Sequence, residues 1–156
     1  MRIEIDGAHS GIRFSACHFI TGHEKCARLH GHSYIIRLSL EGEIGSDGMI
    51  MDFVVLKRAL RQVVNILDHR VLLPGNSKEA SLEIGEEVTV ISGGKRYVFP
   101  LEDVVILDVE HTTAEEMAAM ILDGIIEDVE LPSNVTAISL GLDEERGQTA
   151  WARRVL

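Results

Sequence analysis

A thiol and two imidazoles lie close together in the stretch CARLHGH, which covers residues 26–32. Cysteine and histidine are common zinc ligands, and both also take part in proton transfer. Residues two apart in a strand share a face, so His30 and His32 can turn toward one ion if a strand begins there. His18 is the candidate for a third ligand, because an antiparallel return of the chain after residue 20 would place it beside the start of the next strand.

Three imidazoles around one zinc ion would leave a coordination position open for water or substrate, as in catalytic zinc sites. Cys26 offers a different outcome, because its thiolate could be a fourth ligand and close the site as a structural one. A third interpretation is that the histidines are unconnected surface residues. Residue types alone leave these interpretations open. His9, His23 and His111 are expected to be ordinary polar residues, and Cys17 a small buried side chain.

Cys26 is also a candidate for proton transfer, together with Asp68 and His69. A thiol is mostly protonated at neutral pH, but a neighbouring metal or imidazolium favours the thiolate, which can act as a base or nucleophile. Asp68 and His69 come at the end of an expected helix, where the helix dipole favours an imidazolium and a carboxylate can orient a ring. The alternative is that this pair only terminates the helix. Adjacency in the sequence does not show that the pair reaches Cys26.

Two helices are expected from hydrophobic residues that recur at three- and four-residue steps. The first covers residues 53–67 and is capped by Asp52. The second starts at Thr113, whose hydroxyl forms a capping box with Glu116, and stops before Pro132.

Strands are predicted where apolar and polar residues alternate between turn signals. The first two should be antiparallel neighbours that hold the histidines, and the third and fourth should form a hairpin. The expected strands are 9–19, 32–43, 86–91, 96–99, about 135–143 and 148–155.

The chain has 156 residues, a formal net charge of −10 and only two cysteines. This length suits one domain over residues 1–156 that needs no disulfide support. We see no apolar run long enough for a membrane span and no signal-peptide pattern, so a cytoplasmic protein without a membrane partner is expected. The acidic balance disfavours nucleic acid as a partner, because phosphate contacts need clustered lysines and arginines.

Taken together, these motifs resemble the 6-pyruvoyltetrahydropterin synthase and 6-carboxytetrahydropterin synthase family. The resemblance runs over nearly the whole chain in order. Its separate signals are a phenylalanine-led strand ending in His18, CARLHGHSY at 26–34, Met51-Asp52-Phe53 before a helix, Leu67-Asp68-His69 after it, and TTAEEMA at 112–118.

The resemblance implies an α+β tunnelling fold, with an antiparallel four-stranded sheet and two helices on one face. In this chain an inserted hairpin is added within residues 76–108 or thereabouts. In such a family trimers close barrels, two trimers stack into a homohexamer, and active sites lie between subunits. The expected partners are therefore a small-molecule pterin and further copies of this chain.

The resemblance also implies a zinc ion as cofactor and 7,8-dihydroneopterin triphosphate as substrate. The expected zinc ligands are His18, His30 and His32. The expected proton-transfer residues are Cys26, Asp68 and His69. Zinc in an open site can polarise the hydroxyls of the substrate side chain and acidify adjacent C–H bonds, a thiolate can then remove a proton, and His69 would be the complementary acid.

Pterin recognition in this family uses a carboxylate that accepts two parallel N–H bonds from the pyrimidine edge. Glu144 and Glu145 compete for that role. Strand alternation puts Glu144 on the apolar face and Glu145 on the outer face, so we choose Glu144. Thr112 and Thr113 match the pterin-pocket threonines, although helix capping already explains Thr113.

The spacing Cys-x3-His-Gly-His is more similar to the 6-carboxytetrahydropterin synthase branch, which feeds 7-deazaguanine (queuosine) biosynthesis, than to the pyruvoyl branch. The first branch releases the distal side-chain carbons as acetaldehyde, whereas the second retains them as a pyruvoyl group. A third relative forms a hydroxymethylpterin with a glutamate in place of the cysteine, and Cys26 argues against it. From another class, a noncatalytic zinc- or pterin-binding protein stays open.

Three departures from the family pattern affect these expectations. A Leu-Asn usually follows Leu-Asp-His, where this chain has RVLLPGN at 70–76. The usual Glu-Thr of the last hairpin is Glu144-Glu145, and a late tyrosine is replaced near Trp151. The last two changes affect the contact with the pterin edge.

Overall fold

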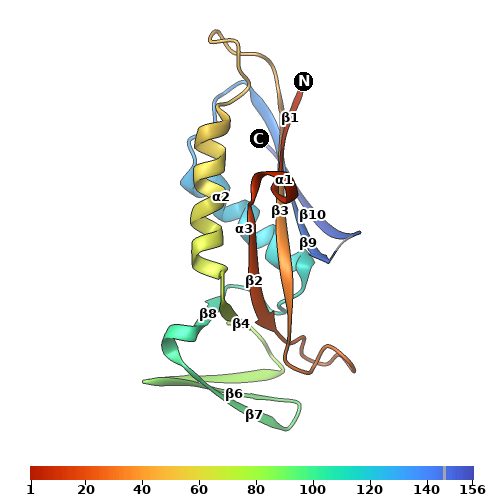
Figure 1. Ribbon diagram of the computed structural model, residues 1–156, viewed down its shortest axis with the longest axis vertical. Coiled ribbons are helices and arrows are strands. Elements are labelled where there is room, and N and C mark those ends of the chain that lie inside the picture. The colour runs from red at the N-terminus through yellow and green to blue at the C-terminus, as the bar shows by residue number, and fades with distance from the viewer. Residues whose placement is uncertain (146) are drawn as a thin grey trace.

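The structure is a computed structural model that describes residues 1–145 and 147–156. Figure 1 shows an elongated molecule in which a long sheet runs beside two helices, with a smaller sheet at one end. The elements in chain order are β1 Arg2–Asp6, α1 Gly7–Ser10, β2 Arg13–His18, β3 His30–Gly42, α2 Phe53–Leu67, β4 Arg70–Pro74, β5 Ala80–Ile84, β6 Glu87–Ser92, β7 Lys95–Pro100, the 3-10 turn η1 Leu101–Asp103, β8 Val104–Leu107, α3 Ala114–Asp128, β9 Val135–Glu145 and β10 Gln148–Val155.

The main sheet has seven strands in the order β10-β9-β3-β2-β4-β8, with β1 also paired to β3. The expected antiparallel unit of four strands is present as β10, β9, β3 and β2. The expectation of a simple four-stranded antiparallel sheet was wrong, because β4 pairs parallel to β2 and β8 pairs parallel to β4. The sheet is therefore large and mixed.

Strands β4 and β8 have short apolar sequences, RVLLP and VVIL. Apolar runs this short lack the alternation that identifies a half-exposed strand, and their parallel partners are distant in the sequence. Strand β1 was also missed, although its sequence RIEID alternates; it continues the edge of β3 beyond the point where β2 begins. The pairing of all three strands depends on tertiary contacts rather than on local pattern.

Helices α2 and α3 form where the sequence predicted them. Asp52 caps α2 by accepting from the N–H of Val54 at 2.8 Å, and the Thr113 hydroxyl accepts from the N–H of Glu116 at 3.4 Å. The second half of the predicted capping box is replaced, because the Glu116 carboxylate accepts from the N–H groups of Glu110 and His111 instead. None of the helices in the described residues is long and apolar enough to cross a membrane.

The main core lies between one face of the sheet and these two helices. Leu56 and Leu60 of α2 and Met117 of α3 pack with Ile36 and Leu38 of β3 in one buried cluster. Burying side chains of this size contributes roughly 1.5–3 kcal/mol each, so the core fixes the position of β3, whose first residues are two of the histidines.

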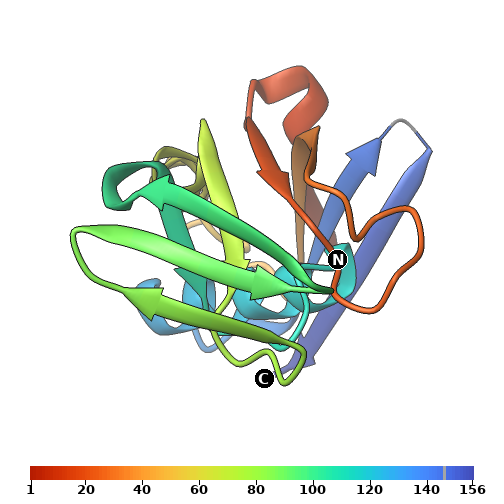
Figure 2. The same ribbon diagram turned by 90° about the horizontal axis from the view of Figure 1, so that it is seen from below.

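The inserted segment forms its own three-stranded antiparallel sheet, β5-β6-β7, rather than only the expected hairpin. Its hairpin part, β6 and β7, agrees with the prediction, and β5 is the strand that was missed. A second core joins Val88 and Val90 of β6 to Phe19, and to Val71 and Leu73 of β4. Seen from below in Figure 2, this green sheet lies near the loop that connects β2 to β3.

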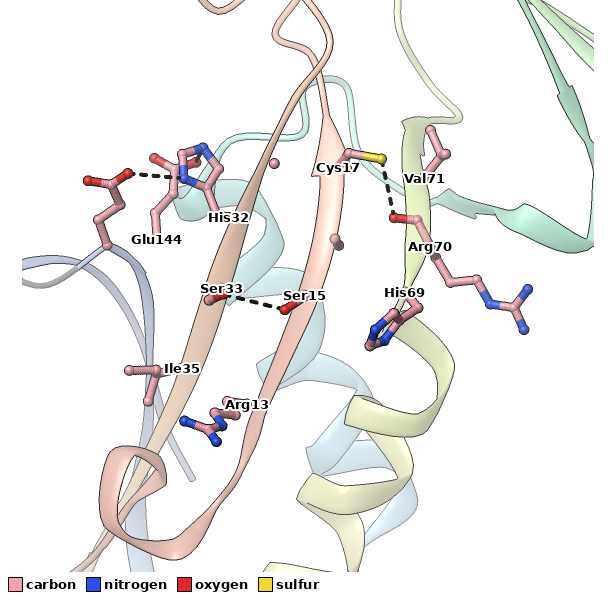
Figure 3. Close-up of a pocket in the computed structure, with 13 residues that line it drawn as sticks. Arg13, Ser15, Cys17, His32, Ser33, Ile35, His69, Arg70, Val71 and Glu144 are labelled. Atoms are coloured by element: carbon pink, nitrogen blue, oxygen red, sulfur yellow. Dashed lines mark hydrogen bonds and ion pairs between the residues drawn. The ribbon is translucent and has the colours of Figure 1, made fainter.

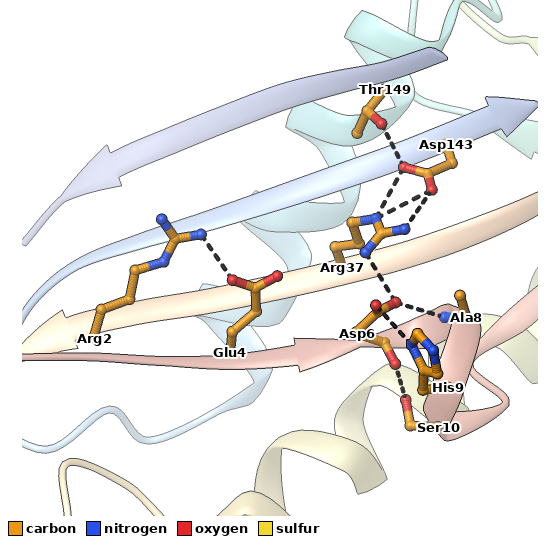
Figure 4. Close-up of polar contacts among 9 residues, drawn as sticks. All are labelled: Arg2, Glu4, Asp6, Ala8, His9, Ser10, Arg37, Asp143 and Thr149. Carbon is orange, nitrogen blue, oxygen red and sulfur yellow. Dashed lines mark hydrogen bonds and ion pairs between the residues drawn. The ribbon is translucent and has the colours of Figure 1, made fainter. Parts of the chain in front are cut away.

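On the face of the sheet away from the main core, a cluster of charged residues ties three strands together (Figure 4). The Arg37 guanidinium contacts the Asp143 carboxylate at 3.1 Å and the Asp6 carboxylate at 2.9 Å. Asp143 is almost fully buried, and Thr149 also donates a hydrogen bond to it at 2.7 Å. This network secures the end of β9 immediately before Glu144.

Candidate metal centre and active site

The three expected zinc ligands lie together where β2 ends and β3 begins. The antiparallel register places His18 directly opposite His30, and Ala16 opposite His32. His18, His30 and His32 therefore project from the same face of two neighbouring strands, and their ligand atoms lie within 4.8 Å of one another. The return of the chain after residue 20 agrees with the prediction, and the histidines are not scattered over the surface.

Two backbone carbonyls orient two of the rings. The Nδ1 atom of His18 lies 2.7 Å from the carbonyl oxygen of Thr112, and that of His30 lies 2.7 Å from the carbonyl oxygen of Arg28. A carbonyl can only accept, so Nδ1 carries the proton in each ring and Nε2 keeps its lone pair. A hydrogen bond of this kind fixes the tautomer of a histidine that binds metal through its other nitrogen.

The donor set fits a zinc ion. Both ring nitrogens of His32 are buried without a hydrogen-bond partner among the residues that the structure describes. A buried polar atom left without a partner costs free energy, so an ion is a physically reasonable partner for His32. Burial, assisted by the two neighbouring imidazoles and opposed by the hydrogen bond to Thr112, lowers the pKa of His18 to about 4. His18 is therefore neutral at pH 7, as a metal-binding imidazole must be.

Two further side chains face the histidines. The Glu144 carboxylate lies 3.5 Å from Nε2 of His18 and 3.6 Å from Nε2 of His32. The hydroxyl of Tyr34, which is fully buried, lies 3.3 Å from Nε2 of His18. Burial, together with the Glu144 carboxylate, raises the pKa of Tyr34, so this hydroxyl stays protonated and is available as a donor.

Cys26 lies in the loop between β2 and β3, and its side chain is half-buried. Its carbonyl accepts from the N–H of Ile20 at 2.8 Å, and its N–H donates to Nδ1 of His23 at 3.0 Å. Among the described residues, the group with metal-binding spacing consists of the three histidines without Cys26. This arrangement favours an open metal site over one closed by the thiolate.

Asp68 and His69 lie at the other side of β2. One Asp68 carboxylate oxygen accepts from the N–H of Ser15 at 2.8 Å, and the other lies 2.8 Å from Nδ1 of His69. The N–H of Ser15 and the His69 ring lower the pKa of Asp68, so it is ionised at neutral pH and orients the His69 ring. In the described residues no hydrogen bond or ion pair joins this pair to Cys26.

The backbone of His69 is the one non-glycine position of the described chain with a positive φ, 57°. Left-handed backbone is unfavourable for a residue with a side chain, although histidine tolerates it better than most. The N–H of His69 donates to the carbonyl of Ser15 at 2.7 Å, which holds the residue in this conformation. Retained strain of this kind is concentrated at functional sites, so the observation supports a role for the His69 ring.

An open pocket of about 940 Å³ lies between His32 and His69 (Figure 3). His32 and Glu144 line one side, and His69 and Arg70 line the other. Its floor is formed by small residues of β2 and β3, including Ser15 and Ser33, whose hydroxyl oxygens are 3.4 Å apart. Ser15 and Ser33 point to the face of the strands opposite the three histidines, and His32 is the member of the histidine cluster that lines this pocket. A substrate in this pocket would therefore reach His69 and the cluster at His32.

The threonines expected to bind the pterin are occupied by structural contacts. Thr112 is fully buried, its hydroxyl donates to the carbonyl of Phe19 at 2.8 Å, and its own carbonyl accepts from His18. The Thr113 hydroxyl caps α3. Thr112 thus supports His18 directly through its carbonyl, and it holds the neighbouring Phe19 through its hydroxyl. This structural role was not predicted from the sequence.

Tyr34 and His23 were also missed as members of the site. Tyr34 could have been found, because it continues the every-second-residue pattern of His30 and His32 along β3. His23 gave no such signal, since it acts through the loop by accepting from the N–H of Cys26.

This arrangement defines a protein with a candidate three-histidine metal site, and comparison with known proteins identifies the family. A family model described as 6-pyruvoyl tetrahydropterin synthase matches residues 9–154. The chain therefore belongs to the 6-pyruvoyl tetrahydropterin synthase family, as the sequence motifs predicted.

Two curated relatives carry the name of the carboxy branch. A Methanocaldococcus jannaschii protein named provisionally as 6-carboxy-5,6,7,8-tetrahydropterin synthase is 33% identical, over 100% of this chain and 98% of the relative. A Rickettsia typhi 6-carboxy-5,6,7,8-tetrahydropterin synthase is 29% identical, over 85% of this chain and 89% of the relative.

Two solved structures are closely similar. The Plasmodium falciparum 6-pyruvoyl tetrahydropterin synthase has a TM-score of 0.92 at 26% identity, and the Plasmodium vivax enzyme of that name has a TM-score of 0.92 at 29% identity. Each comparison covers 100% of this chain and 98% of the other chain.

Proposed function

We propose that this chain is a zinc-dependent lyase that converts 7,8-dihydroneopterin triphosphate and one water molecule to 6-carboxy-5,6,7,8-tetrahydropterin, with loss of acetaldehyde and triphosphate. The observation that carries the proposal is the convergence of His18, His30 and His32 in a chain of this family, with the His32 ring nitrogens buried and without a hydrogen-bond partner in the described part of the chain. The names of the curated relatives support the carboxy product.

His18, His30 and His32 would hold the zinc ion, which when bound polarises the substrate's side-chain hydroxyls and acidifies the adjacent C–H bonds. Cys26, poised in the loop between two of these histidines, removes a proton from the side chain. His69, with its ring oriented by Asp68, returns a proton to the product.

Cys26 and His69 complete one site by meeting across a subunit boundary. Within one chain, the backbone of His69 is bonded to Ser15 of β2, whereas Cys26 is bonded to His23 in the loop that follows β2. The His69 side chain is 83% exposed. An exposed histidine whose left-handed backbone is held by its hydrogen bond to Ser15 is well placed to meet the Cys26 of a second copy. This proposal rests on the homohexamer expected for the family.

Glu144 is proposed to anchor the pterin. Its carboxylate faces His18 and His32 with the side chain 24% exposed, whereas the Glu145 side chain is 68% exposed and lies 3.8 Å from Nδ1 of His32. If Glu144 binds the pyrimidine edge of the pterin, the side chain of the substrate lies beside the histidine cluster. Thr112 and Thr113 then act indirectly, since the Thr112 carbonyl orients His18 and the Thr113 hydroxyl caps α3.

Glu144→Gln is expected to raise KM for the pterin by about tenfold to a hundredfold, because an amide cannot accept the two charge-assisted bonds that a carboxylate accepts. Glu145→Gln, which changes the same charge one residue away, is the matched control and should alter KM by less than about threefold. Steady-state kinetics on both variants measures this difference. Equal effects of the two substitutions would contradict the assignment of Glu144 as the anchor.

His69→Gly is expected to lower turnover by about a hundredfold or more, because it removes the proton carrier. Its free energy of unfolding should exceed that of His69→Ala by up to about 1 kcal/mol, because glycine relieves the left-handed backbone and alanine does not. Denaturant unfolding and turnover of both variants test the two effects separately. Normal turnover in either variant would remove His69 from the mechanism.

Incubation of the purified protein with zinc and 7,8-dihydroneopterin triphosphate tests the proposed reaction. Release of acetaldehyde with a 6-carboxy product supports it. A 6-pyruvoyl product without acetaldehyde would establish the second candidate, which the similarity to the two Plasmodium 6-pyruvoyl tetrahydropterin synthases favours. Bound zinc without any turnover would favour a noncatalytic binding protein.

A further inference from the structure

The loop of residues 19–29, called here the Cys26 loop, begins and ends at candidate metal ligands. His18 precedes it, His30 follows it, and these two residues pair across β2 and β3. A change in the path of this loop therefore moves Cys26 relative to a base that the main sheet holds fixed. Accurate placement of the thiol requires that something restrain the loop.

Internal hydrogen bonds give the Cys26 loop its local shape. Besides the two bonds of Cys26 already described, the N–H of Ala27 donates to the carbonyl of His23 at 3.1 Å. These bonds join loop residues to one another. They fold the loop without fastening it to the rest of the molecule.

The inserted sheet supplies contacts from outside the loop. The Nζ atom of Lys95, the first residue of β7, donates to the carbonyl of Ala27 at 3.1 Å, one residue after Cys26. In the described part of the chain, two side chains from distant elements reach the backbone of the Cys26 loop: the Thr112 hydroxyl bonds the carbonyl of Phe19, where the loop begins, and Lys95 bonds the carbonyl next to Cys26. Figure 1 shows the inserted sheet and the loop at the same end of the molecule.

An aromatic stack adds a second contact. The rings of Phe19 and Tyr97 are stacked with centroids 5.5 Å apart and an angle of 15°, and Tyr97 is stacked in turn on Phe99. Phe19 is buried in the second core together with β6 and β4. At the far side of the loop, a Cβ on Gly22 would lie 2.6 Å from the Glu79 carboxylate, so this turn also lies close against the segment that leads into β5.

We propose that the inserted sheet β5-β6-β7 is a positioning element for Cys26, acting through the Lys95 amine on the Ala27 carbonyl and through Tyr97 stacked on Phe19. The positioning role rests on the proposed function in one respect only, namely that Cys26 must be placed for proton transfer. Lys95 and Tyr97 touch neither the histidine cluster nor the thiol in the contacts of the described residues. They are therefore positioning residues rather than catalytic ones.

Hydrogen exchange and thiol reactivity test the restraint without reference to turnover. Lys95→Met keeps the aliphatic length and removes the donor, whereas Lys95→Arg keeps a donor. Arg96→Met removes the same charge from the neighbouring position of β7 and is the control. Each variant is made in a Cys17→Ala background, so that alkylation by iodoacetamide reports on Cys26 alone.

In Lys95→Met, the amide hydrogens of residues 20–29 should exchange several-fold faster than in the parent. In the double variant Lys95→Met/Tyr97→Leu they should exchange about tenfold faster. The rate of Cys26 alkylation should increase to match in both variants. Strands β2 and β3 should exchange as in the parent, which excludes global unfolding. Lys95→Arg should restore the parent rates, and Arg96→Met should not change them. In turnover, kcat of the double variant should fall about tenfold or more while KM stays constant, because misplacement of a catalytic group affects the chemical step.

Unchanged exchange and alkylation in Lys95→Met and in the double variant would overturn the positioning role. Equal effects of Lys95→Met and Arg96→Met would overturn it too, because charge rather than the hydrogen bond would then be responsible. Faster exchange in a protein that never turns over the pterin would leave the restraint in place and reject the proposed reaction instead.

Discussion

His32→Ala is expected to abolish zinc binding and turnover together. His32 is the histidine of the cluster whose two ring nitrogens are buried without a hydrogen-bond partner among the described residues. Loss of an outer hydrogen bond to a metal ligand typically costs 10- to 100-fold in affinity, so loss of a ligand itself should cost at least about a thousandfold. Turnover should fall with the metal, because the pterin side chain is no longer activated.

The stability of the metal-free protein should respond differently. Alanine removes two buried nitrogens that are unsatisfied without metal, and this gain offsets the packing lost with the ring. In the presence of a chelator, the free energy of unfolding of His32→Ala should therefore lie within about 1 kcal/mol of that of the parent. With zinc present, only the parent should gain stability, by an amount that grows with the zinc concentration.

Metal analysis, zinc titration and denaturant unfolding measure these effects. His9→Ala is the matched control, because the His9 side chain is 88% exposed and pairs with Asp6 far from the cluster. This control should keep its zinc and its turnover. Full activity of metal-depleted His32→Ala would refute the zinc-dependent mechanism.

The histidine cluster could be predicted from the sequence because it depends on local geometry. His30 and His32 are two apart in one strand, and a single reversal of the chain brings His18 opposite His30. The position of Glu144 was predictable for the same reason, since the parity of β9 puts it on the face of Leu140 and Leu142. Its approach to the histidine rings was not, because that depends on how closely β9 and β3 are paired.

Other parts of the site depend on contacts that are distant in the sequence. The parallel pairing of β4 with β2 brings Asp68 and His69 to Ser15, and no local pattern indicates such a pairing. Thr112 contacts His18 although the two residues are 94 positions apart in the sequence. The motif TTAEEMA marked Thr112 as important, but only its place in the fold shows that its carbonyl and hydroxyl support the histidine and the start of the Cys26 loop.

Cys26→Ala is expected to retain zinc and to lose turnover by about a thousandfold, within the range for removal of a general base. Cys26 lies outside the group with metal-binding spacing, so alanine should leave the histidine cluster intact. The contacts that shape its loop use the backbone N–H and carbonyl of Cys26, and alanine keeps both. The expected loss is therefore chemical rather than structural.

Cys17→Ala is the matched control, because Cys17 is the second cysteine and is half-buried. Its thiol lies 3.8 Å from the carbonyl oxygen of Arg70, on the face of β2 opposite His18, and turnover should change little when it is removed. Cys26→Ser adds a further distinction, because serine keeps the size and polarity of the side chain but is a much weaker source of an anion. Turnover near the parent value in Cys26→Ser would indicate a packing role. Loss of zinc from Cys26→Ala would instead make the thiolate a ligand, and the open site on which the proposed reaction depends would be closed.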